Sequence, residues 1–109
     1  LPVSEALMNA AQTCSDKLYS YHHNREECEA VAASGYPNGF GSNLTAFTGA
    51  AREDIAQRAV TNWLNSPGHR DTMLDPGCDS LGVGVTEGGN GVTYCYLFLG
   101  KPGTHNPYE

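Results

Sequence analysis

Helical periodicity fills most of the first two thirds of the chain, and alternating strand patterns appear only at its end. Apolar residues recur every three or four positions in residues 4–23, 26–33 and 52–65. Residues 81–86 and 92–99 instead alternate across a glycine-rich turn, which is typical of an antiparallel hairpin. Because helices and strands do not alternate as βαβ units, the pattern predicts an α+β domain and excludes a doubly wound parallel sheet.

The hairpin needs a partner, because two strands alone are marginally stable in water. We expect it to pack under the helix that contains Trp63, or to pair with a strand hidden in residues 35–49. That segment is rich in glycine and asparagine and otherwise predicts an ordered loop, with apolar anchors facing inward. Gly82 and Gly84 alternate with valines, so another element is expected to approach this strand closely.

Size and charge set further limits. The 109 residues predict one domain over residues 1–100, followed by a tail, residues 101–109, with no core of its own. A net charge of −6 argues against nucleic-acid binding, which needs a basic surface. The apolar runs are too short to span a membrane. The first residues carry no leader features, so we expect a processed chain or a segment of a longer one.

The cysteines leave two alternatives open. They allow disulfides in an oxidising compartment, or they are buried free thiols. The sequence contains no CxxC or CxxH spacing, so a structural zinc knuckle is not expected. We favour a secreted or cell-surface protein, with disulfides among four residues: Cys14, Cys28, Cys78 and Cys95.

Histidines are the main candidates for chemistry. His69 follows the helix start Ser66-Pro67, where the helix dipole favours a neutral imidazole. A structural role for it is preferred over a role as metal ligand or general base. His22 and His23 are adjacent and point in different directions, so at most one can join His69.

The remaining polar residues give weaker signals. The nearest carboxylates, those of Glu26, Glu27 and Asp71, are interpreted as solvated, and His105 as incidental. No serine lies in a nucleophile elbow and no cysteine lies in a recognisable protease motif. Asn43-Leu44-Thr45 matches the N-glycosylation pattern, which is also common by chance.

Residues 63–74, WLNSPGHRDTML, and residues 81–85, LGVGV, resemble the bacterial branch of the CAP (SCP-like) superfamily. This superfamily includes cysteine-rich secretory proteins, plant pathogenesis-related proteins of class 1 and insect venom allergens. Weaker similarities extend to residues 7–18 and 94–100, and residues 41–44, GSNL, occupy the place of the family motif G-E-N-I. The resemblance implies an α-β-α sandwich with a small antiparallel sheet between helices. It also implies that the chain begins after the helix that opens most family members.

The resemblance further implies a cleft built from two histidines and two acidic residues, which in some members binds zinc or another divalent cation. His69 matches the second family histidine, and His22 or His23 matches the first. Ser42 stands where the family has a glutamate. Ser66 stands where animal members have the second glutamate, although bacterial members commonly have serine there.

These replacements predict a binding module with no catalytic residues rather than an enzyme. The expected ligand is a lipid or sterol, a peptide, a glycan or a protein partner. The expected cleft residues are His22, His23, Ser42, Asn43, Ser66 and His69. No cofactor is expected, and if zinc binds, its expected ligands are His23 and His69. The alternatives are a metal-assisted peptidase using His69 with His22 or His23, its third ligand coming from Glu26 or another chain, and a structural spacer within a larger surface protein.

Overall fold

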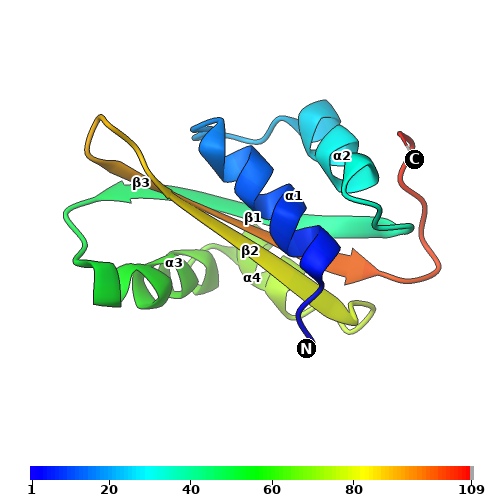
Figure 1. Cartoon of the computed structure of the whole chain (residues 1–109). Helices are drawn as coiled ribbons and strands as arrows, with labels where there is room; N and C mark the ends of the chain where they lie inside the picture. Colours follow the sequence, from blue (N-terminus) through cyan, green and yellow to red (C-terminus); the bar gives the residue numbers. More distant parts are fainter. Residues whose placement is uncertain (109) are drawn as a thin grey trace.

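The computed structural model describes residues 1–108 and shows a three-layer sandwich (Figure 1). The antiparallel sheet has the strand order β1-β3-β2. Helices α1 and α2 cover one face of it, and α3 and α4 lie on the other (Figure 1). The elements, in chain order, are α1 (Glu5–Asp16), α2 (Asn24–Ala33), β1 (Gly39–Thr48), the 3₁₀ turn η1 (Arg52–Asp54), α3 (Ile55–Leu64), α4 (Pro67–Met73), β2 (Ser80–Glu87) and β3 (Val92–Lys101). The predicted α+β class and α-β-α arrangement are confirmed.

The turn-rich segment of residues 35–49 contains a full strand rather than a loop. β1 pairs along its length with β3, with Leu44 opposite Tyr96. The hairpin therefore pairs with a strand in residues 35–49, which is the second of the two arrangements expected for it. Phe40 and Leu44 join the core beneath α1 and α2, whereas Phe47 joins the core beside α3. Burial of these apolar side chains against the helices stabilises the strand despite its glycines and asparagine.

The helix ends differ from the sequence pattern at two places. α1 ends at Asp16 rather than near residues 19–23, and Leu18 adopts a positive φ of 59° that breaks the helix. The helix expected over residues 52–65 begins as the separate turn η1 before α3.

β3 forms the centre of the core because both of its faces are covered. Tyr96 and Phe98 pack beneath α1 and α2, and Leu97 and Leu99 pack on the opposite face with Trp63 of α3. The two helical layers are therefore held together by side chains that alternate along one strand.

The cysteines are free thiols in the structure, so the expected disulfides are not confirmed. Cys14 of α1 lies in the apolar cluster on the α1 and α2 side of the sheet, and Cys95 lies in the cluster on the opposite face. Cys78 belongs to the same apolar cluster as Cys95, but it precedes Ser80, which lies opposite Gly100 of β3. Cys95 is five positions from Gly100, about 17 Å along the strand. Cys78 and Cys95 are therefore separated along the sheet by more than the Cα distance of a disulfide.

Gly82 and Gly84 allow α1 to pack directly against β2, as their alternation with valine predicts. A Cβ atom at Gly82 would collide with the backbone of Leu7 and Met8, and one at Gly84 with the backbone of Ala11. Backbone contact of this kind requires glycine, and it seats α1 across the sheet.

The segment after Lys101 packs back onto the domain and, up to residue 108, adds no side chain to either apolar cluster. Asn106 within it is only 2% exposed. Among residues 1–108, no helix is long and apolar enough to cross a membrane.

Candidate functional site

A buried carboxylate organises one side of the candidate site. Glu27 lies in the first turn of α2 and is 1% exposed. His22, in the linker between α1 and α2, donates from Nδ1 to Glu27 Oε2 at 2.8 Å. The Tyr96 hydroxyl donates to the same oxygen at 2.7 Å, and Ser42 Oγ donates to Oε1 at 2.7 Å. Donors from two strands, β1 and β3, and from one linker therefore converge on a single carboxylate of α2.

These hydrogen bonds decide the protonation of the network. Burial alone would raise the pKa of Glu27, but the donors His22, Tyr96 and Ser42 outweigh burial and lower it. The hydrogen bond to Glu27 raises the pKa of His22 against the opposing effect of burial. The pair is therefore an ionised carboxylate with an imidazole that readily holds a proton.

The other side of the site comes from the opposite helical layer. His69 lies on α4, whose N-cap is Ser66, and His69 Nδ1 shares a hydrogen bond of 2.9 Å with Ser66 Oγ. Asn43 of β1 donates from Nδ2 to the backbone oxygen of His69 at 2.9 Å. This contact ties α4 to β1 and positions the His69 ring. Because Asn43 is fully buried, the glycosylation pattern there does not mark an accessible acceptor in the folded protein.

His22 and His69 face each other at the β1 edge of the sheet. Their ring centroids lie 6.1 Å apart with planes 25° from parallel. Burial lowers the pKa of His69, and the positive charge of His22 lowers it further. Because each Nδ1 is already engaged, both rings keep Nε2 for a ligand. His22 therefore offers a hydrogen-bond donor, and His69 offers a neutral imidazole.

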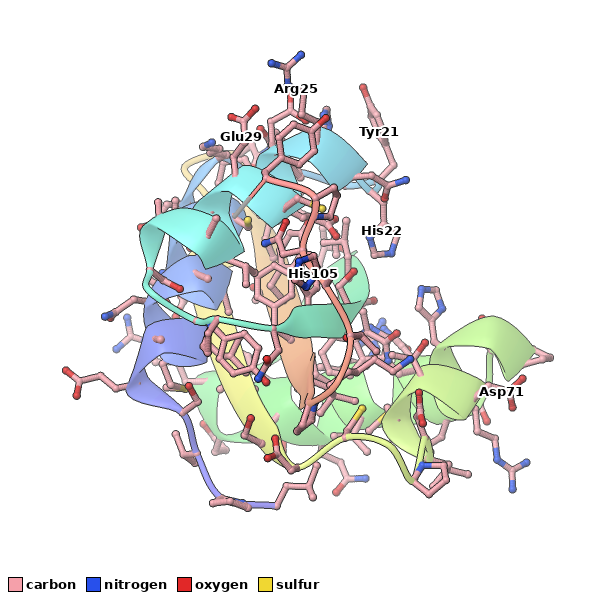
Figure 2. The ribbon with its side chains drawn as sticks, turned by 90° about the vertical axis from the view of Figure 1, so that its right-hand side faces the viewer. Tyr21, His22, Arg25, Glu29, Asp71 and His105 are labelled. Atoms are coloured by element: carbon pink, nitrogen blue, oxygen red, sulfur yellow. The ribbon has the colours of Figure 1, made fainter. Side chains whose placement is uncertain are left out.

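His22, and not His23, is the histidine that joins His69. The His23 ring stacks on Tyr19 at 3.7 Å and on Tyr21 at 4.7 Å between centroids. The expected zinc pair of His23 and His69 is therefore not brought together. Figure 2 shows His22 projecting from the α1–α2 linker on the same side of the molecule as Tyr21.

The structure also separates the carboxylates that the sequence grouped. Glu27 is buried in the network, whereas Glu26 is half-buried outside it and Asp71 is exposed on α4. The burial of Glu27 corrects the interpretation of its carboxylate as solvated. A signal was present, because Glu27 precedes the buried Val31 by four positions and so lies on the inward stripe of α2.

The donor set does not fit a closed zinc site. Among residues 1–108 there is no group of three His, Cys, Asp or Glu side chains placed to share a metal ion. Zinc sites in proteins use three or four protein ligands, and this site offers the two histidines. The carboxylate beside them is already held by three donors.

The family model described as "CAP: Cysteine-rich secretory protein family" matches residues 1–98. The chain belongs to the CAP family. No curated protein matches its sequence.

Among the solved structures that match, two illustrate the shared fold. An outer surface protein from Borrelia burgdorferi superposes with a TM-score of 0.67 at 18% identity, over 93% of this chain and 77% of that protein. BmVAL-1 superposes with a TM-score of 0.73 at 16% identity, over 93% of this chain and 58% of that protein. At these identities the similarity concerns the fold. In this CAP domain, Ser42 lies where the family resemblance places a glutamate, and Glu27 of α2 supplies the carboxylate beside Ser42.

Proposed function

We propose that this CAP domain is a binding module whose cleft takes a polar ligand. The observation that supports this is the state of Glu27, whose carboxylate already accepts hydrogen bonds from His22, Ser42 and Tyr96. A carboxylate held in this way orients its neighbours but is not free to accept a proton from a substrate. The site therefore presents fixed hydrogen-bonding groups rather than a general base.

The chemistry of the cleft favours a peptide or a glycan over a lipid or sterol. His22 offers a donor, the lowered pKa of His69 keeps that ring neutral, and Ser66 adds a hydroxyl beside it. Such groups recognise hydroxyl, amide and carboxylate groups through paired hydrogen bonds. The family, and a structural neighbour described as an outer surface protein, support a location outside the cell or on its surface.

Arrays of defined peptides and glycans test this proposal. We expect the domain to bind a restricted set of them, and His69→Ala to reduce that binding at least about tenfold by removing one central hydrogen-bonding group. Asp71→Ala is the matched control, because Asp71 is exposed on the same helix and outside the network. The absence of any bound probe, or equal loss in both variants, would contradict a ligand site at the two histidines.

A metal-assisted peptidase is the alternative, and exchanging the carboxylate tests it. In the double variant Ser42→Glu/Glu27→Gln, the negative charge moves from α2 to β1, where the resemblance places the family glutamate. We expect the double variant to bind zinc at least about tenfold more tightly than the natural domain, because a third ligand becomes available. Calorimetric titration measures this, with His69→Ala added to each protein as the control. Tight zinc binding by the natural domain, lost in His69→Ala, would favour the peptidase.

A further inference from the structure

The C-terminal segment forms a strap, defined here as residues 104–108. A turn with Gly103 at a φ of 82° reverses the chain after β3, and Thr104 Oγ1 donates to the backbone oxygen of Lys101 at 2.7 Å. The Gly39 N–H then donates to the Thr104 oxygen at 3.1 Å. A Cβ atom at Gly39 would collide with the Thr104 side chain, so this close approach of the strap to β1 requires glycine.

One side chain anchors the strap to α2. Asn106 donates from Nδ2 to the backbone oxygen of Cys28 at 2.9 Å, and its Oδ1 accepts from the Tyr108 N–H at 2.9 Å. At the outer end, the Arg25 guanidinium lies 5.7 Å from the centre of the Tyr108 ring. Asn106 is the only buried residue from Pro102 to Tyr108. The strap is thus held by a few polar contacts and by no side chain of the apolar core.

The strap forms one wall of an open pocket that reaches the carboxylate network. The pocket has a volume of about 240 Å³ and is lined on one side by His105 and Asn106, and on the other by Glu27, Cys28 and Ser42. Figure 2 shows the strap crossing in front of the start of β1, with His105 on it and Arg25 above. Glu27 and Ser42 therefore belong both to the cleft network and to this pocket behind it.

We propose that the strap is a movable wall of the ligand site, which narrows the approach to Glu27 and Ser42 when it lies against α2 and widens this second route to them when lifted. Segments with few buried apolar contacts open locally at a small fraction of the cost of global unfolding. The route ends at the Ser42 hydroxyl oxygen and at the Glu27 carboxylate, whose three donors leave about one acceptor position open. It therefore suits a ligand group that donates hydrogen bonds, such as an amine or an amide. The purpose of this gate rests on the proposed binding function, but its movement is measurable without any ligand.

Cys28 reports directly on strap opening. Its thiol lines the pocket and is half-buried, whereas the other three cysteines are buried in the core. Burial and the nearby charge of Glu27 raise the pKa of Cys28, so lifting the strap increases both its access to reagent and its thiolate fraction. The rate of iodoacetamide alkylation at Cys28, followed by mass spectrometry, therefore measures the open population.

The decisive variant is Asn106→Ala, which removes the anchor to α2. We expect Cys28 in the full chain to be alkylated at least about fivefold faster, the effect of losing one buried hydrogen bond. Asn90→Ala is the matched control, because Asn90 also makes two hydrogen bonds but lies in the distant β2–β3 turn, and it should leave the rate unchanged. An unchanged Cys28 rate in Asn106→Ala would overturn the proposal. Equal acceleration at all four cysteines would also overturn it, because the strap would then only support global stability. Failure of the array experiment would leave this rate comparison unaffected.

Discussion

Gly84→Ala is expected to lower the free energy of unfolding by about 3 kcal/mol, because its Cβ atom would occupy the space of the Ala11 backbone. The neighbouring atoms belong to α1 and not to a flexible side chain, so the whole helix must shift on β2. Replacing glycine also reduces the entropy of the unfolded chain, which favours folding by about 0.4–1 kcal/mol. A net decrease in the free energy of unfolding therefore measures the cost of the collision.

Urea unfolding followed by Trp63 fluorescence measures this effect, since Trp63 is 4% exposed in the core. Gly89→Ala is the matched control, because a Cβ atom at Gly89 has no neighbour within 4 Å and its φ is not positive. That variant should lie within about 0.5 kcal/mol of the natural protein. Equal stability of the two variants would show that α1 does not rest directly on the β2 backbone.

Glu27→Ala is expected to cost a similar amount, about 3 kcal/mol, because it leaves the donors of His22, Ser42 and Tyr96 without their acceptor. The pKa of His22 should fall, since the hydrogen bond to Glu27 is what raises it. Glu29→Ala is the matched control on the same helix. Glu29 is half-exposed and pairs with Arg25 at the surface, so its loss should cost under about 1 kcal/mol.

The cost of Glu27→Ala should depend on pH in a defined direction. Glu27 has a lowered pKa, so its contribution is present above its ordinary value of 4.5 and is lost as pH falls through the pKa in the folded state. His22 has a raised pKa, so its contribution is present below 6.5 and is lost as pH rises through the pKa in the folded state. The difference in free energy of unfolding should therefore be largest between these limits, as chemical unfolding across a pH series would measure. A difference independent of pH would contradict the ionised pair.

Some contacts of the candidate site join residues within one helical turn, and others depend on the path of the chain between helices. Only contacts of the first kind can be predicted from the sequence. Ser66 and His69 lie within one turn of α4, so their hydrogen bond follows from a local motif. The contact of His22 with Glu27 spans five residues, but it depends on how the linker leaves α1, which the positive φ of Leu18 decides. Sequence reasoning could therefore name His22 and His23 as alternatives and not choose between them.

The sequence by itself determined the helices, the hairpin and the close approach at Gly82 and Gly84. These features depend on periodicity and on backbone freedom within a few residues. β1 was ambiguous, because its glycines and asparagine resemble a loop until β3 supplies hydrogen bonds from about fifty residues away.

Only the tertiary structure decided that Glu27 is buried, that His22 faces His69, and that the strap forms one wall of a pocket beside the network. Tyr96 reaches Glu27 across 69 positions in the chain, and Asn106 reaches Cys28 across 78. Burial of a charged side chain depends on donors arriving from other elements, because an ionised carboxylate without them would remain in water. No local pattern carries that information, since each donor belongs to a different part of the chain.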